Sequence, residues 1–207
     1  PSNTAGEKKE DDNNRIVVDG THPISNETLL NYLESRCIPS ELAKRFCIEV
    51  DFILYDKKQT AIGFPNDSGG YELRNQYFKG SSSPKASTFI DNKSTRVLVF
   101  EGFFDFLSYQ SLYSNKEGPA PNIIVLNSLA FFEKQKIKME GHKQIHLFLD
   151  RDPAGMKCTE QVLKSGSRYI DKSHLYSNFK DLNEWVIQAS RSRLLYENMK
   201  RDPVNNQ

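Results

Sequence analysis

The chain has 207 residues, and its 28 lysines and arginines nearly balance its 27 aspartates and glutamates, so overall charge alone does not indicate a nucleic-acid-binding protein. It has no run of about 18 apolar residues and no charged-then-apolar leader, which argues against a membrane-spanning helix and a signal peptide. Its three cysteines are scattered without a C-x-x-C pair, which favours a reducing cytoplasm and predicts no zinc in this chain.

The two ends of the chain are predicted to lie outside the folded part. Residues 1–15 are polar and charged and lack large apolar side chains, which is typical of a disordered leader or linker. Residues 191–207 are interpreted as a C-terminal tail. Because the sequence starts without methionine, we expect it to be a fragment of a longer protein.

Residues 16–94 are predicted to form a small α+β unit with an antiparallel sheet. Leucines at helical spacing follow a helix start signal at 25–27, and turn signals separate short runs rich in β-branched and aromatic residues. The predicted elements are helices from 25 and over 40–45, and strands over 47–55, 60–64 and 71–74.

Residues 95–190 change to an alternation of strand and helix. This rhythm predicts an α/β unit with a mostly parallel four-stranded sheet and right-handed crossovers. The predicted strands cover 96–100, 122–126, 145–149 and 173–176, and the predicted helices cover 103–113, 131–138, 154–168 and 182–189.

A first acidic cluster, Glu101 and Asp105, directly follows the apolar run 97–100. Ligands of open α/β sheets bind at the carboxyl ends of the strands, and Asp105 lies one helical turn after Glu101, so both can face one pocket. The alternative is that these acids simply complement the dipole at a helix N-terminus.

A second cluster, Asp150 and Asp152, follows the apolar run 145–149. Residues i and i+2 of an extended chain point to the same side, so two carboxylates share one face there. Pro153 suits the first turn of a helix, and Gly155 permits a close approach of another segment. The alternative is an acidic N-cap.

A third cluster spans residues 180–184, where Asp181 and Glu184 could equally form a capping box. Carboxylates that converge from three segments repel one another, and oxygen-only ligands favour Mg²⁺ or Mn²⁺. We therefore expect the three clusters to share a divalent metal site.

The order E-G-x-x-D, D-x-D-x-A-G and K-D-x-N-E over residues 96–189 resembles the Toprim domain, a Rossmann-like fold of primases, topoisomerases and nucleases. The resemblance implies that Glu101 is a general acid/base. It also implies a two-metal site for Mg²⁺ or Mn²⁺ held by Asp105, Asp150, Asp152 and Asp181. Asn183 departs from the pattern, because primases often carry a second aspartate there.

The upstream half is similar to the catalytic core of DnaG-type primases, particularly those of plasmids and mobile elements. Residues 31–39 resemble Y-L-x-x-R-G-I with Cys37 in place of glycine, residues 63–70 resemble F-P-I-x-D-x-x-G, and residues 79–84 resemble K-Y-x-N-S-P. This resemblance implies that the basic side chains Arg74, Lys79 and Lys85 contact the phosphates of a single-stranded DNA template.

The function implied by the two resemblances is that of a DNA primase core, a cytoplasmic nucleotidyltransferase that makes short RNA primers from NTPs on single-stranded DNA. A replicative helicase would bind through regions outside this chain. Two alternatives stay open: a metal-dependent Toprim nuclease and a non-catalytic DNA-binding module. Tyr77 and Phe78 could stack a base but are expected to pack, and the four histidines lack ligand spacing and are given no role.

Overall fold

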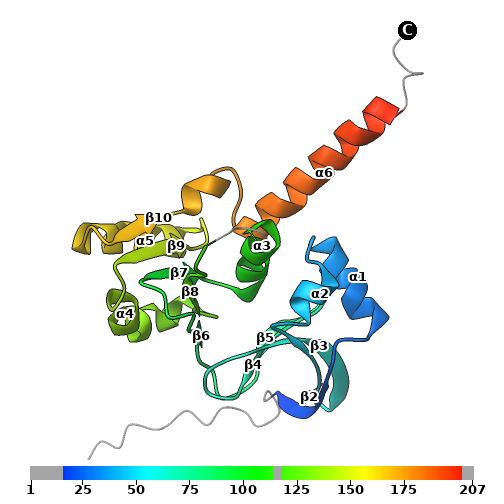
Figure 1. Ribbon diagram of the computed structural model, residues 1–207. Coiled ribbons are helices and arrows are strands. Elements are labelled where there is room, and N and C mark those ends of the chain that lie inside the picture. The colour runs from blue at the N-terminus through cyan, green and yellow to red at the C-terminus, as the bar shows by residue number, and fades with distance from the viewer. Residues whose placement is uncertain (1–15, 114–117, 202–207) are drawn as a thin grey trace, which may run out of the picture.

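The computed structural model describes residues 16–113 and 118–201 and contains two five-stranded sheets that meet around one core (Figure 1). The first sheet is an antiparallel meander in the order β1-β2-β3-β4-β5. Two helices, α1 (Glu27–Ser35) and α2 (Ser40–Ala43), lie between its first two strands in the sequence. Its strands are β1 (Val17–His22), β2 (Ile48–Leu54), β3 (Lys57–Pro65), β4 (Tyr71–Arg74) and β5 (Lys79–Ser81).

The predicted antiparallel α+β unit is therefore present, but its two edge strands were not predicted. β1 contains Asp19-Gly20, a dipeptide typical of turns, and its valines are exposed instead of forming an apolar core stripe. β5 is only three residues long, which is too short to show a period.

The second sheet has the order β10-β9-β7-β8-β6, and four of its strands are parallel. The parallel strands are β7 (Arg96–Phe100), β8 (Asn122–Val125), β9 (Gln144–Phe148) and β10 (Tyr169–Asp171). The fifth, β6 (Thr88–Ile90), pairs antiparallel with β8 at one edge. The mostly parallel α/β sheet is confirmed, although β6 lies before residue 94 in the sequence.

The helices of this unit are α3 (Phe103–Tyr113), α4 (Phe132–Glu140), α5 (Pro153–Ser165) and α6 (Leu182–Arg201), with short 3₁₀ helices η2 (Leu129–Phe131) and η3 (Ser173–Tyr176). The strand predicted over 173–176 is wrong, because η3 occupies these residues and the last strand is β10. The Asp171 carboxylate accepts a hydrogen bond from Ser173 N–H at 2.7 Å, which turns the chain at this point. No helix among the described residues has the length and apolar character needed to cross a membrane.

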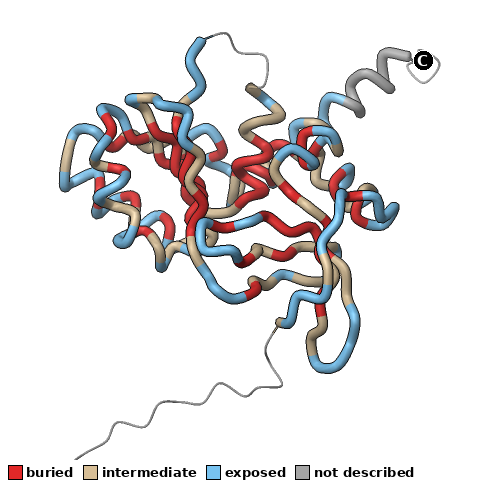
Figure 2. The backbone as a smooth tube through the Cα atoms, turned by 60° about the horizontal axis from the view of Figure 1, so that its bottom comes forward, coloured by how far each residue is buried: buried red, intermediate tan, exposed pale blue. Residues whose placement is uncertain are grey.

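The phenylalanines of α3 join the two sheets into one core. Phe103 stacks on Phe64 of β3 with ring centroids 5.3 Å apart, and Phe104 contacts Tyr32 of α1 edge to face at 5.6 Å. Phe106 is fully buried between them and its own sheet. These rings pack α3 onto its own sheet and also hold the first unit against it, and Figure 2 shows buried backbone running through the centre of the molecule.

Cys37 adopts a left-handed backbone conformation, with a φ of 55°, at the end of α1. Cys37 N–H donates to Glu34 O and Ile38 N–H donates to Leu33 O, which is the hydrogen-bond pattern of a Schellman motif. Glycine is the residue favoured at this position, because any Cβ is strained there. The geometry gives a physical reason for glycine in the similar primase segment.

We expect Cys37→Gly to stabilise the protein by about 1 kcal/mol, because it relieves the left-handed strain at Cys37. Urea denaturation monitored by circular dichroism measures the change in the free energy of unfolding. Cys158→Gly is the control, since Cys158 lies inside α5, where glycine costs about 1 kcal/mol. An equal loss of unfolding free energy in both variants would contradict backbone strain at Cys37.

Candidate active site

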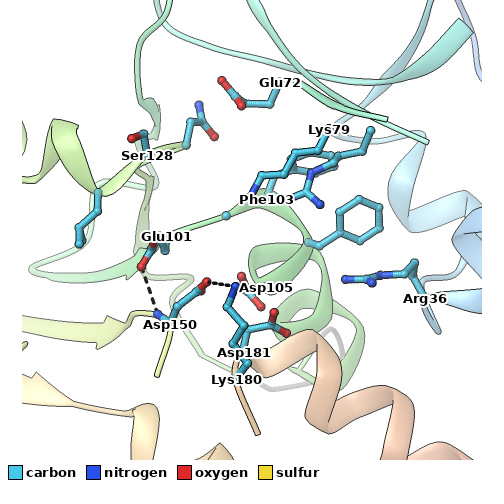
Figure 3. A pocket seen from close by; sticks show the side chains of 15 residues that line it. Arg36, Glu72, Lys79, Glu101, Phe103, Asp105, Ser128, Asp150, Lys180 and Asp181 are labelled. Atoms are coloured by element: carbon cyan, nitrogen blue, oxygen red, sulfur yellow. Dashed lines mark hydrogen bonds and ion pairs between the residues drawn. The ribbon is translucent and has the colours of Figure 1, made fainter. Parts of the chain in front are cut away.

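A polar cleft of about 420 Å³ opens between the two sheets (Figure 3). One wall comes from the carboxyl ends of the parallel strands and the other from α1, β4 and β5 of the antiparallel unit. Acidic and basic side chains therefore face a common space. The lining residues are Arg36, Glu72, Arg74, Lys79, Glu101, Gly102, Phe103, Phe104, Asp105, Asn127, Ser128, Leu129, Asp150, Lys180 and Asp181.

Glu101 and Asp150 lie at the carboxyl ends of the adjacent strands β7 and β9. The backbone N–H of Asp150 donates to Glu101 Oε2 at 3.2 Å, which fixes one oxygen of the glutamate. Gly155 makes this arrangement possible, because a Cβ there would lie within 2.1 Å of Asp150 O. The sequence predicted that these two acids meet, and the structure brings them together.

Asp105 and Asp181 complete the acidic wall from α3 and from the residue before α6. Asp105 is buried, and its Oδ1 accepts a hydrogen bond from Asn183 N–H at 3.1 Å. Asp181 Oδ1 accepts from Glu184 N–H at 2.7 Å, while Glu184 Oε2 accepts from Lys180 N–H at 2.7 Å. The capping alternative for Asp181 is therefore realised together with its place in the cleft.

Asp152 differs from the other predicted metal ligands. It is the N-cap of α5, and its Oδ1 accepts hydrogen bonds from Ala154 N–H and Gly155 N–H at 3.1 and 3.0 Å. It does not line the cleft, although its charge helps to raise the pKa of both Glu101 and Asp150. Asp152 therefore has the geometry of a helix N-cap, which was the alternative interpretation of its sequence.

Asn183 is fully buried and does not line the cleft. Its side-chain Nδ2 donates to Arg36 O at 2.9 Å and to Ser108 Oγ at 2.8 Å, so it connects α6 with α3 and with the end of α1. The departure from the family pattern thus places an amide donor between the two units. A carboxylate could not donate these two hydrogen bonds.

Burial and mutual repulsion raise the pKa values of the acids in the cleft. Burial raises the pKa of Asp150 to about 7, and the charges of Glu101 and Asp181 add to the shift while Lys180 opposes it. Burial is also the main cause of the raised pKa of Glu101. For Asp105, burial and then the charges of Asp181 and Asp150 raise the pKa well above its usual value.

This donor set fits a divalent cation with a preference for oxygen ligands. The carboxylates of Glu101, Asp105, Asp150 and Asp181 line one cleft (Figure 3), and Lys180 Nζ lies 3.9 Å from Asp150 Oδ2. Burial, and then neighbouring negative charge, raise the pKa values of Asp105 and Asp150, and a bound cation would favour their ionised forms. Mg²⁺ and Mn²⁺ take carboxylate ligands of this kind.

The basic wall contains two of the three predicted cations. Arg74 and Lys79 are directly paired across β4 and β5, and both line the cleft. Lys85 is exposed and does not line it. Arg36 and Lys180 also line the cleft but were not among the predicted site residues; Arg36 belongs to the primase-like segment 31–39, which was the available signal.

The hairpin between β4 and β5 presents Tyr77 to solvent, with 87% of its surface exposed. Asn75 Oδ1 accepts hydrogen bonds from Tyr77 N–H and Phe78 N–H, which closes the turn. Phe78 packs on Phe52 with ring centroids 5.1 Å apart. The expectation of packing is therefore confirmed for Phe78 and wrong for Tyr77.

We expect the metal-free protein to lose stability as pH rises from about 4 to about 7. The pKa of Asp150 is about 7 in the folded chain against a usual 3.8, so the folded state binds this proton more tightly than the unfolded state does. Ionisation therefore destabilises the fold, by roughly 1–3 kcal/mol once solvent screening is included. Urea denaturation with EDTA at several pH values measures the slope.

Two controls separate this effect from other titrating groups. Asp150→Asn should reduce the slope, because one titrating carboxyl is gone, while Glu72, whose pKa burial raises to about 7, should keep part of it. Saturating Mn²⁺ should flatten the slope in the wild type, because a cation compensates the carboxylates. A wild-type slope that neither change affects would exclude Asp150 as its source.

Comparisons with known proteins divide the chain into two matched regions. Residues 98–186 match the family model described as Toprim-like, and residues 18–83 match a domain of unknown function, DUF8464. Comparison with the curated proteins gives no match.

The fold is similar to that of the primase fragment of the bacteriophage T7 primase-helicase protein, with a TM-score of 0.57 and 17% identity over 86% of this chain and 78% of that one. A second T7 structure shows primase domains of two gp4 subunits bound to an RNA/DNA hybrid and dTTP, with the lagging-strand DNA polymerase. It matches with a TM-score of 0.56 and 17% identity over 79% of this chain and 88% of that one. The chain therefore contains a Toprim-like domain over residues 98–186, and its fold is similar to that of a phage primase fragment.

Proposed function

We propose that the chain is the catalytic core of a DNA primase, which synthesises short RNA primers from NTPs on single-stranded DNA. The observation that carries the proposal is the cleft itself, where carboxylates of the Toprim-like unit face Arg36, Arg74 and Lys79 of the antiparallel unit. We assign residues 95–190 to catalysis and residues 16–94 to template binding. A cytoplasmic location and a replicative helicase as partner belong to the same proposal.

The acidic wall would hold the metal ions of this reaction. Asp105, Asp150 and Asp181 are the candidate ligands, and Asp152 is a further candidate through its oxygen that does not cap α5. Bound divalent ions would supply positive charge that stabilises the attacking and leaving oxygens of nucleotidyl transfer.

Glu101 is the candidate general base for the 3′-hydroxyl of the growing primer. The Asp150 N–H holds Oε2, which leaves Oε1 to accept the proton. Burial raises the pKa of Glu101, which makes its carboxylate a better proton acceptor near neutral pH.

The basic wall would hold the phosphates of the nucleotide and template. Arg74 is half-buried, so solvent screens the charge-assisted hydrogen bonds of its guanidinium less than those of the exposed Lys79. Arg36 lies over the Phe104 ring at 5.1 Å, which fixes its position beside the cleft. Lys85 is assigned to the template path outside the cleft.

We expect Lys79→Ala to weaken binding of single-stranded DNA and to reduce the salt dependence of binding. Loss of one phosphate contact on a single strand should lower the slope of log K against log salt by about 0.7. Fluorescence anisotropy with a labelled oligonucleotide at several salt concentrations measures both quantities. Lys57→Ala, at the opposite end of β3 from Phe64, is the control and should leave the slope unchanged.

A Toprim nuclease is the second candidate, because the same carboxylates would serve phosphodiester cleavage. The antiparallel unit and its basic wall favour the primase. They precede the Toprim-like domain in the chain, and the likeness to the T7 primase fragment extends over them as well. The third candidate, a non-catalytic DNA-binding module, would retain the cleft without turnover.

One assay separates the three candidates. The protein is incubated with single-stranded DNA, labelled NTPs and Mg²⁺ or Mn²⁺, and a 5′-labelled primer–template is run in parallel. New RNA or a lengthened primer supports the primase, and shortened strands support the nuclease. Binding of DNA without either product would identify a binding module and overturn the proposal.

A further inference from the structure

Three side chains with metal-ligand chemistry, His22, Glu49 and Asp51, lie together on β1 and β2. His22 Nε2 is 3.1 Å from Asp51 Oδ2 and 3.9 Å from Glu49 Oε1, and the three ligand atoms all lie within 4.8 Å of one another. None of the three residues lines the cleft. They form a separate candidate site, which we call the β1–β2 cluster.

Strand pairing explains why the β1–β2 cluster forms. His22 is directly opposite Glu49 in the antiparallel register, and Gly20 is opposite Asp51. Directly opposed residues share one face of a sheet, and Glu49 and Asp51, two apart on β2, point to the same side. The histidine and both acids therefore project from one face, although no local spacing in the sequence indicates this.

Hydrogen bonds to one oxygen of each carboxylate orient the side chain, and the other oxygen of each faces His22. Glu49 Oε2 accepts hydrogen bonds from Ser25 N–H and Asn26 N–H, both at 2.9 Å, and no hydrogen bond among the described residues reaches Oε1. Asp51 Oδ1 accepts from Thr60 Oγ1 at 2.6 Å, and Oδ2 faces the imidazole. Such supporting hydrogen bonds are the usual way in which proteins orient metal ligands.

Glu49 is the most buried member of the β1–β2 cluster. Its side chain is only 5% exposed, yet one carboxylate oxygen is turned into the space shared with His22 and Asp51. The group that faces this oxygen is the imidazole of His22, 3.9 Å away, and a bound cation would supply the positive charge in that space. Lys58 pairs with Asp19 at 3.1 Å, so His22 is the ion-pair partner of both acids of the cluster.

We propose that the β1–β2 cluster binds a divalent transition-metal ion, with Zn²⁺ as the best-fitting ion. Ligand atoms of a tetrahedral zinc site lie about 3.4 Å apart, a value between the two distances from His22 Nε2. One imidazole and two carboxylates make a three-ligand set, and the half-exposed His22 and Asp51 leave room for water as the fourth ligand. Imidazole distinguishes this set from the all-oxygen set of the cleft.

The bound ion would join β1 to β2 and to the start of α1. Glu49 already holds the backbone at Ser25 and Asn26, and Asn26 is the N-cap of α1. The sequence predicted no zinc because the chain lacks a C-x-x-C pair. That criterion applies only to zinc sites built from cysteines. The β1–β2 cluster uses no cysteine.

Isothermal titration calorimetry with Zn²⁺ on the metal-free 207-residue chain tests the proposal together with thermal unfolding. We expect a zinc equivalent that persists in Asp150→Asn, and a rise in Tm of about 5–10 °C at a hundredfold excess over Kd. His22→Gln, which can keep a hydrogen bond to Asp51, should weaken binding at least tenfold. Asp51→Asn, which can still accept from Thr60, should weaken it as well.

His174→Gln is the matched control, because His174 is an exposed histidine on η3 whose Nδ1–H donates to the backbone carbonyl of Asp171. It should bind Zn²⁺ as the wild type does. The proposal is overturned if the wild type binds no Zn²⁺, if His22→Gln binds it as tightly as the wild type, or if Asp150→Asn abolishes binding, which would place the ion in the cleft. Because the cleft variant is included, the result does not depend on primase activity.

Discussion

Asp150→Asn is expected to lower primer synthesis by about 10³-fold or more while leaving the protein folded. Asparagine has nearly the same shape, and the Asp150 backbone N–H that holds Glu101 Oε2 is unchanged. The variant loses the negative charge at the centre of the acidic wall. Metal-ion stabilisation of the transition state supplies several kcal/mol, and each 1.36 kcal/mol corresponds to about tenfold in rate.

The same substitution should stabilise the metal-free protein, which distinguishes it from a substitution that merely unfolds the chain. Asp150 is largely buried among like charges, so removing its charge relieves repulsion worth roughly 1–3 kcal/mol after screening. Steady-state kinetics and urea denaturation with EDTA measure the two effects. Asp91→Asn, in the exposed loop before β7, is the control.

Primer synthesis by Asp150→Asn at a rate close to that of the wild type would remove Asp150 from the proposed metal site. A variant that loses both activity and stability would instead show that Asp150 supports the fold. Neither result is compatible with the electrostatics derived from the cleft.

Gly155→Ala is expected to reduce activity about a hundredfold, although residue 155 does not line the cleft. A Cβ at this position would lie 2.1 Å from Asp150 O and 3.0 Å from Asp150 C, so the backbone that carries Asp150 must move. A displacement of about 1 Å at a catalytic group can cost about 10²-fold in rate. Overpacking should also destabilise the protein by about 1–3 kcal/mol.

Gly166→Ala is the matched control, because a Cβ at residue 166 meets no atom within 4 Å and its φ of 173° is ordinary extended backbone. Both variants are compared by primer synthesis and by thermal unfolding. Wild-type activity in Gly155→Ala would mean that the position of Asp150 is not critical for the reaction.

The meeting of Glu101, Asp105, Asp150 and Asp181 could be predicted from the sequence because each follows a recognisable local pattern. The apolar runs before Glu101 and Asp150 identify buried parallel strands, and the carboxyl ends of such strands meet at one edge of a sheet. The roles assigned to these residues are still proposals. Asp152 had two interpretations from its sequence, and the geometry of the α5 N-cap realises the capping one.

Features that depend on distant segments could not be predicted. β6 joins the second sheet only through its pairing with β8, and Tyr176 in η3 is held by a hydrogen bond from its hydroxyl to Leu149 O. Asn183 contacts Arg36, 147 residues away in the sequence. His22 faces Asp51 across two strands whose register no local pattern reports. In each case tertiary contacts outweigh local preference.

The most direct test of the account is a crystal structure grown with Mn²⁺ and a non-hydrolysable NTP, with the metal located by its anomalous scattering. We expect Mn²⁺ about 2.2 Å from carboxylate oxygens of Asp150 and its neighbours Asp105 or Asp181, with the triphosphate extending toward Arg74 and Lys79. A cleft without Mn²⁺ at saturating concentration, or a triphosphate bound away from both walls, would contradict it.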